Sequence, residues 1–228
     1  KNYVENDSTH SIVLKNKFVL PGLIDAHVHF ATDPTEERRD NAEKTLKEML
    51  LTGVTAVRDM AGDTRALSSL ARNTLIGDTD GPDIYYSSLM AGPKFFSDPR
   101  TIATAQGGIS GKMPYMKAID STSNLALEVA QARGTGAAGI KLYANLSRQE
   151  IVDIVKEAEQ QGIKVWSHAA LYPTKPSEVI SSGVISVSHV HMLLQEKYLM
   201  DTVRMEKWKN FTSGENDSPF WDEEFKSL

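Results

Sequence analysis

Histidines are the residues of this 228-residue chain whose spacing best suits chemistry. The six histidines are His10, His27, His29, His168, His189 and His191. His27 and His29 stand two residues apart in the apolar run Leu-Ile-Asp-Ala-His-Val-His-Phe, which is typical of a strand. Residues two apart on a strand share one face, so the two imidazoles can bind one cation together. His10 lies outside any such run, and we expect it to be inert.

A lysine and two further histidines recur at comparable places along the chain. Lys141 lies in the apolar run Gly-Ile-Lys-Leu-Tyr, and His168 and His189 lie at or near the ends of two later strand-like runs. The intervals between these three residues each approximate one strand–helix unit of roughly 20–30 residues. Because parallel strands present their carboxyl ends on one face, we expect all three side chains to meet His27 and His29 there.

Two other residues are candidates for contact with a substrate. Tyr143 lies two residues after Lys141, and His191 lies two residues after His189, so each should share a strand face with a candidate ligand. Packing at the rim is the alternative role for both. We expect Asp25, Arg58 and Asp59 to be structural or to support the ligands rather than to react.

The elements that must position these residues alternate between strand-like and helix-like runs. Strands are expected over 23–30, 54–59, 83–90, 139–144, 163–168 and 184–191. Helices are expected from Asp33 to Gly53, over 63–74 and 122–134, after a capping box of Ser147 and Glu150, and over 176–182. This alternation predicts an α/β fold with a parallel sheet, a TIM-type (β/α)8 barrel of which about six units are present.

Three segments depart from the pattern. Residues 91–118 show no clear period, which is typical of a lid, a binding loop or a disordered segment. Residues 1–20 hold short β-type pieces and are interpreted as the remnant of a small N-terminal β-sandwich domain. Residues 21–228 form the barrel part, within which 190–228 are expected to be irregular or helical.

Composition excludes several classes of protein. The formal net charge of −5 argues against a nucleic-acid footprint, and no apolar run is long enough to span a membrane. The absence of cysteine excludes disulfides, zinc–thiolate sites and cysteine nucleophiles. None of this determines the compartment, and a homo-oligomer remains open.

Five motifs together resemble the amidohydrolase superfamily, in its imidazolonepropionase-like and prolidase-like branch. They are Leu-Pro-Gly-Leu-Ile-Asp-Ala-His-Val-His at 20–29, Gly-Val-Thr-Ala-Val-Arg-Asp at 53–59, Gly-Ile-Lys at 139–141, Ser-His-Ala at 167–169 and Gly-Val-Ile-Ser-Val-Ser-His at 183–189. The resemblance spans about 12–191.

The resemblance implies a metal-dependent hydrolase that acts on a C–N bond. His27 and His29 would bind one divalent metal ion, and His168 and His189 a second. Lys141, carboxylated by CO₂, would bridge the two ions, for which zinc is the best fit. A hydroxide between the metals would attack the amide of a small-molecule substrate, such as a dipeptide or a cyclic amide.

The family also places a catalytic aspartate after the eighth strand, and this sequence stops before the seventh. We therefore assign no catalytic base, and we expect the 228-residue chain to be inactive without the missing C-terminal part of the barrel. Two alternatives remain. One is a mononuclear imidazolone hydrolase or deaminase in which Lys141 is not a ligand, and the other is a non-catalytic metal-binding module.

Overall fold

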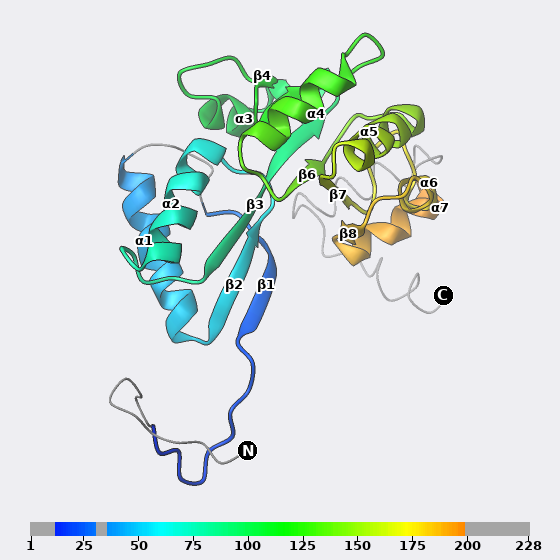
Figure 1. The fold of residues 1–228 in the computed structure, drawn as a ribbon. Coiled ribbons are helices and arrows are strands. Elements are labelled where there is room, and N and C mark those ends of the chain that lie inside the picture. The colour runs from blue at the N-terminus through cyan, green and yellow to red at the C-terminus, as the bar shows by residue number, and fades with distance from the viewer. Residues whose placement is uncertain (1–11, 31–35, 199–228) are drawn as a thin grey trace, which may run out of the picture.

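Six parallel strands form the frame of the molecule. The structure is a computed structural model that describes residues 12–30 and 36–198. Its main sheet has the order β1-β2-β3-β6-β7-β8, and each strand runs parallel to its neighbour (Figure 1). The strands are β1 (Leu23–Val28), β2 (Val54–Asp59), β3 (Asp83–Ala91), β6 (Gly139–Leu142), β7 (Lys164–His168) and β8 (Ser186–Ser188). The strand–helix alternation predicted from the sequence is confirmed.

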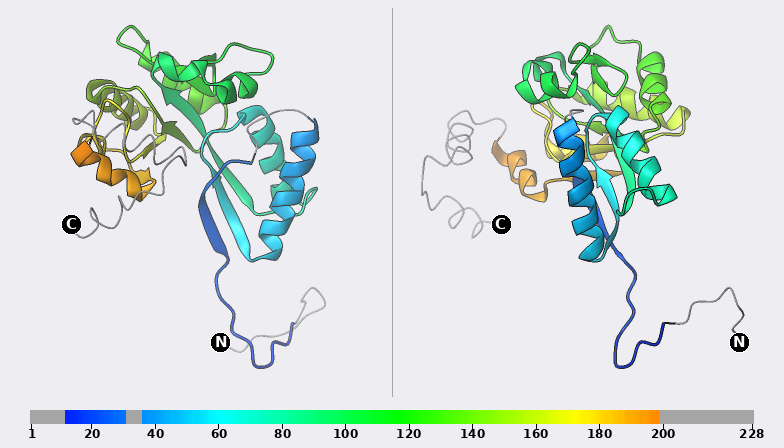
Figure 2. Two further views of the ribbon diagram at one scale, coloured as in Figure 1. Left: turned by 180° about the vertical axis from the view of Figure 1, so that it is seen from behind. Right: turned by 90° about the vertical axis from the view of Figure 1, so that its left-hand side faces the viewer.

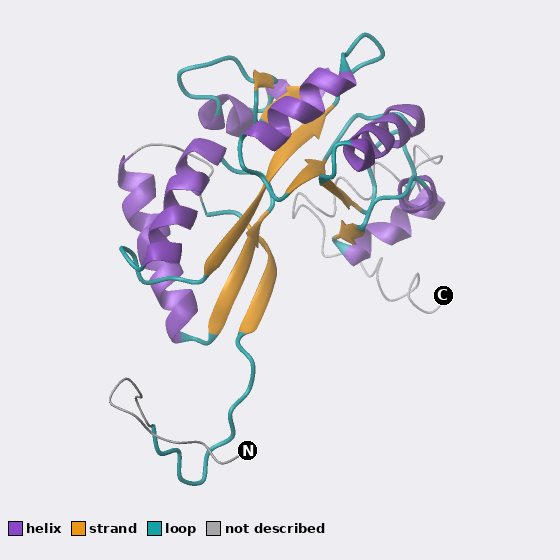
Figure 3. Cartoon of the chain, viewed as in Figure 1, coloured by secondary structure: helices purple, strands orange, loops and turns teal. Residues whose placement is uncertain are grey.

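Helices lie on the outer side of this sheet (Figures 2 and 3). The longer ones are α1 (Glu36–Leu51), α2 (Thr64–Ile76), α4 (Leu125–Gly134) and α5 (Arg148–Gln160), and the short α6 spans Pro176–Ser181. Helix α1 packs on β2, α2 on β3 and α5 on β7. None of the described helices combines the length and apolar character needed to cross a bilayer.

Local sequence signals explain where these helices begin and which face they bury. The hydroxyl of Ser147 accepts from the Glu150 amide, and the Glu150 carboxylate accepts from the Ser147 amide at 2.7 Å, which is the expected capping box. The buried face of α5 is Ile151, Ile154, Val155 and Ala158. Gly53, at φ 93°, makes the turn from α1 into β2. The N-cap expected at Asp33 lies outside the described residues.

The sheet is an incomplete barrel whose end strands approach each other at the carboxyl-terminal side. Nδ1 of His27, on β1, lies 2.9 Å from Oγ of Ser188, at the end of β8. Strands β1 and β8 are the two edges of the hydrogen-bonded order. The curvature therefore brings the first and last strand together across the interior, as a partial (β/α) barrel requires.

The two ends of the described chain differ from each other. Residues 12–20 contain no strand and are exposed, so the small β domain expected over 1–20 stays a prediction, with 1–11 outside the described residues. After β8 the chain forms the short helices η2 (Val190–Leu194) and α7 (Gln195–Tyr198), as the irregular or helical expectation for 190–228 states. Residues 199–228 lie outside the described part.

Residues 91–118 form an ordered, partly buried unit. They contain η1 (Pro93–Ser97), α3 (Pro99–Thr104), β4 (Lys112–Met113) and β5 (Met116–Ala118). β5 pairs parallel with β3, and a buried cluster of Phe96, Ala105, Tyr115 and Met116 packs against Leu89. Disorder, one of the three options for this segment, is therefore wrong. Its elements span only two to six residues, too short to show a helical or strand period in the sequence.

Candidate functional site

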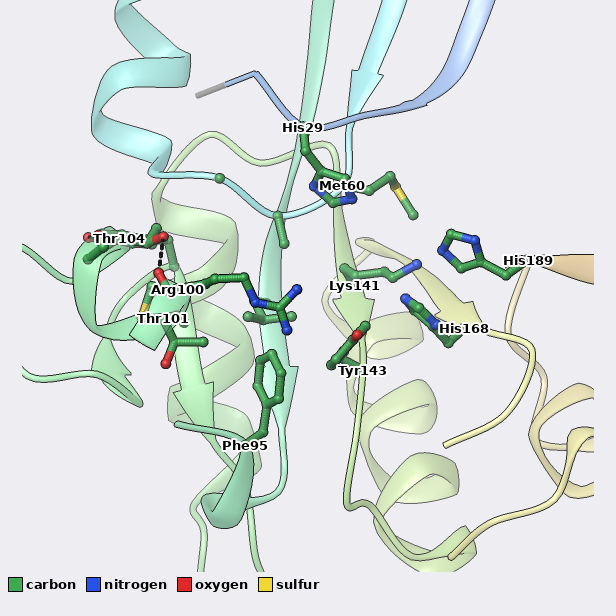
Figure 4. A pocket seen from close by; sticks show the side chains of 16 residues that line it. His29, Met60, Phe95, Arg100, Thr101, Thr104, Lys141, Tyr143, His168 and His189 are labelled. Atoms are coloured by element: carbon green, nitrogen blue, oxygen red, sulfur yellow. Dashed lines mark hydrogen bonds between the residues drawn. The ribbon is translucent and has the colours of Figure 1, made fainter. Parts of the chain in front are cut away.

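A cavity of about 570 Å³ opens at the carboxyl ends of the strands, within the range of small-molecule sites (Figure 4). Four of the five predicted metal ligands line it: His29, Lys141, His168 and His189. The remaining lining residues are Met60, Ala61, Gly62, Leu89, Phe95, Arg100, Thr101, Ala103, Thr104, Tyr115, Met116 and Tyr143. The fifth predicted metal ligand, His27, lies next to His29. The structure thus brings together the residues that the sequence singles out.

His27 and His29 meet through their ring nitrogens. Strand β1 ends at Val28, so His27 is within the strand and His29 follows it directly. Their Nε2 atoms lie 3.0 Å apart. Ser188 contacts the other nitrogen of His27, an arrangement that orients an imidazole and leaves Nε2 for a shared ligand.

Two charged residues near this pair, Asp59 and Arg58, form hydrogen bonds with the backbone before and after the two histidines. Buried Asp59 accepts a hydrogen bond of 3.0 Å from the Phe30 amide, directly after His29. Arg58 donates to the Ala26 carbonyl at 2.8 Å and lies 4.5 Å over the ring of Trp166. These contacts support the structural role that the sequence favours for Arg58 and Asp59.

His168 and His189 lie at the other edge of the sheet from His27, at the end of β7 and directly after β8. His168 is the last residue of β7, and its ring centroid lies 4.3 Å from that of His189. The His189 ring also lies 4.7 Å from that of His27, so β1, β7 and the residue directly after β8 contribute to one cluster of imidazoles. Tyr143 packs edge-on against His168 at 4.2 Å and lines the cavity, consistent with both of the roles expected for it.

His191 is placed differently from the prediction. Strand β8 ends at Ser188, and His189 has a left-handed backbone (φ 65°) as the N-cap of η2. The alternation of a strand therefore does not carry on to His191, which is exposed in η2 with its ring 5.9 Å from that of His189. His191 is not among the described residues that line the cavity.

Lys141 is buried in β6 with its amine directed toward the histidines (Figure 4). Its side chain is 1% exposed, and its Nζ has no hydrogen-bond partner among the described residues. Burial, followed by the charge of Arg58, lowers the pKa of Lys141 to about 7. A buried, unpartnered amine is costly, so this position is unfavourable for lysine unless the amine acquires a further interaction.

The histidines are held in the neutral form. Burial and then the charge of Lys141 lower the pKa of His27 to about 4 and that of His168 to about 2. The same two causes lower the pKa values of His29 and His189. Neutral imidazoles keep a lone pair, which is the form that binds metal ions.

The imidazole nitrogens of the four clustered histidines are ligands of the kind that divalent cations bind. Within residues 12–30 and 36–198, no three His, Asp or Glu side chains are grouped as a ready metal site. Two nitrogens bound to one tetrahedral zinc ion lie about 3.3 Å apart. The Nε2 atoms of His27 and His29, at 3.0 Å, are close to that separation. The unpartnered Lys141 amine adds a further group able to become a ligand.

Sequence reasoning missed Arg100, which lies in the segment without a period and lines the cavity. One signal could have found it. Asp98 followed by Pro99 is an N-cap and an N1 proline, so it predicts a helix with Arg100 in its first turn.

Comparisons with known proteins agree with this architecture. No curated protein matches the sequence significantly. Among solved structures, an uncharacterized protein is 26% identical, with a TM-score of 0.62 over 79% of this chain and 50% of that one. A Xaa-Pro dipeptidase with bound methionine in its active site is 22% identical (TM-score 0.62; 83% and 55% of the two chains). The ochratoxinase of A. niger is 20% identical (TM-score 0.58; 79% and 50%).

The chain therefore spans about half the length of the solved structures it matches. The family model described as "Amidohydrolase family" matches residues 18–205, which is most of the sequence and includes the four clustered histidines and Lys141. The chain belongs to the amidohydrolase family.

Proposed function

We propose that this protein is a metal-dependent hydrolase of amide C–N bonds, with two divalent cations held by His27, His29, Lys141, His168 and His189. The observation that carries the proposal is the meeting of four neutral imidazoles with a buried, unpartnered lysine amine at the strand ends. Membership of the amidohydrolase family supports hydrolysis as the reaction class.

Lys141 would join the site as a carbamate. Its lowered pKa leaves a free amine near neutral pH, and that amine attacks CO₂, forms a C–N bond and releases one proton. The product carries one negative charge and two oxygens, which complement neutral imidazoles as ligands of hard or borderline cations. Carboxylation would thus give the buried amine the interaction that the described residues do not supply.

Bound cations of this kind polarise a carbonyl and lower the pKa of water toward neutrality. The chain's own residues provide the remaining features of the site. His29, His168, His189 and Lys141 line the cavity together with the apolar side chains of Phe95, Leu89 and Met116. None of the described lining residues is acidic, so no general base is assigned among them.

A dipeptide or a related amide is the substrate class to assay first. The structural neighbours include a protein named as a dipeptidase and one named as an ochratoxinase. Zinc is the cation we propose, because imidazole and carboxylate-type ligands suit it.

Metal content tests the proposal directly. The protein is purified with zinc and ¹³C-bicarbonate and compared with Lys141→Met and with Lys117→Met, a control outside the cavity. We expect two zinc ions per chain and a ¹³C carbamate signal in the wild type and the control, with both reduced or lost in Lys141→Met. Release of amino acids from a dipeptide panel measures the activity.

One zinc ion per chain with an unmodified lysine would indicate the mononuclear alternative. Because this chain is expected to be inactive by itself, hydrolysis is assayed on a protein as long as the solved structures it matches. Two bound ions with no hydrolysis of any amide by that protein would favour a non-catalytic metal-binding module. Failure of the wild-type protein to bind zinc would contradict the proposal.

A further inference from the structure

Arg100 occupies the wall of the cavity that faces Lys141. It is the second residue of α3, and its guanidinium extends into the cavity toward Lys141 and Tyr143 (Figure 4). The side chain is 75% exposed, so a molecule that enters the cavity can reach it. The metal centre proposed above does not use this residue.

Asp98 fixes the direction of the guanidinium. Its carboxylate accepts from Nη2 of Arg100 at 2.6 Å and from Nε at 3.0 Å, while Oδ1 also accepts from the Arg100 amide at 2.9 Å. The same carboxylate caps α3, so the Asp98 side chain is itself held by the helix that carries Arg100. Nη1 is the terminal nitrogen that this carboxylate does not occupy. An arginine oriented in advance loses little side-chain entropy when it binds a second anion.

The electrostatic surroundings of Arg100 favour an anion in the cavity. Asp98 is outside the lining, and none of the described lining residues carries a negative charge. Next to Arg100, the ring of Phe95 packs against Tyr143 at 4.6 Å and gives this part of the cavity an apolar surface.

We propose that Arg100 is a specificity-determining residue that binds a carboxylate of the substrate, so that the protein prefers N-acylated amino acids, including dipeptides with a free C-terminus. This assignment rests on the function proposed above, since it places the scissile amide between Arg100 and the histidines. The carboxylate pairs with the guanidinium, and the apolar side chain of the amino acid lies against Phe95, Leu89 and Met116. A charged hydrogen bond of this kind selects an acid over its uncharged amide.

Binding of a matched pair of ligands tests the assignment without any need for turnover. The probes are N-acetyl-L-phenylalanine and N-acetyl-L-phenylalaninamide, which differ only in the carboxylate. Calorimetric titration of the wild type should give a dissociation constant about 10- to 100-fold lower for the acid. In Arg100→Met the preference should fall to near unity. Arg133→Met, an exposed arginine at the end of α4, should keep the wild-type ratio.

The zinc content of each variant separates this inference from the proposed function. Arg100 is not among the proposed ligands, so Arg100→Met should bind as much zinc as the wild type. A wild type that binds both probes equally, or neither, overturns the assignment even when zinc binding and dipeptide hydrolysis are observed. Unchanged preference in Arg100→Met overturns it as well. Absence of zinc binding in the wild type, with the acid preference intact, would count against the proposed function alone.

Discussion

Replacing Lys141 by methionine should make the metal-free protein more stable. The lysine amine is buried in β6 without a hydrogen-bond partner among the described residues, and the side chain is 1% exposed. Methionine has a similar length and volume but no group that needs water. The substitution removes a desolvated amine and keeps the packing.

The size of the effect follows from the pKa of Lys141, which is lowered from 10.5 to about 7. At pH 7 the unfolded chain binds this proton more favourably than the folded chain by about 4 kcal/mol. Below pH 7 both states are protonated and the penalty is complete. Between pH 7 and 10.5 the folded state is deprotonated while the unfolded state keeps its proton, so the penalty falls by about 1.4 kcal/mol per pH unit and disappears near pH 10.5. The gain from Lys141→Met should therefore be about 1–4 kcal/mol at pH 7 and should vanish near pH 10.5.

Urea unfolding in the presence of a chelator and without bicarbonate, at several pH values, measures this gain. Lys117→Met is the matched control, because Lys117 forms an ion pair of 2.8 Å with Glu128 and both side chains are largely buried. That variant should lose about 1–3 kcal/mol at pH 7. A loss of stability in Lys141→Met at pH 7, or a gain that does not depend on pH, would refute the reasoning.

Further substitutions and conditions test other parts of the structure. His27→Ala should abolish zinc binding while the circular dichroism spectrum is retained, and Ser188→Ala should weaken zinc affinity by about 10-fold, because Ser188 orients His27. The pKa of His168 is lowered to about 2, so the unfolded state binds the extra proton first. His168 by itself should therefore contribute about 2 kcal/mol to the stability that the metal-free protein loses as the pH falls from above 6.5 to 5, and His168→Gln should lose less by about that amount in the same thermal unfolding series. Gly139→Ala should lower the free energy of unfolding by about 1–3 kcal/mol, because a Cβ there would lie 2.6 Å from the ring of Trp166; an unchanged midpoint in urea would contradict this.

The sequence predicted the frame of the barrel because its signals are local. Each strand is an apolar run bounded by turn residues, and the capping box of α5 lies within four consecutive residues. Lys141 stands out because it is a charged residue in an apolar run. His27 and His29 stand out because residues two apart on a strand lie on the same face. Those patterns predicted which side chains would meet, although the contacts are made over more than a hundred residues of sequence.

The same rule was wrong for His191, because the strand ended earlier than the apolar pattern did. His189 adopts a left-handed backbone, and the chain turns into η2. A spacing of two residues places two side chains on the same face only while the strand continues. The end of a strand depends on pairing with its neighbour, and β8 pairs with β7 only as far as Ser188.

The segment 91–118 shows the limit of such patterns more clearly, and it holds the residue on which the substrate preference is proposed to depend. Its buried cluster joins Phe96 to Tyr115 and Met116, which lie far from Phe96 in the sequence and share no period with it. Arg100 reaches the cavity because Asp98 directs it and because this cluster seats α3 beside β3, and only the first of these causes is local. The proposed metal ligands lie in regular strands or directly after them, so spacing along the sequence predicts their positions. Groups that select a substrate lie in the connections, where position is a result of tertiary packing, so they become visible only once that packing is known.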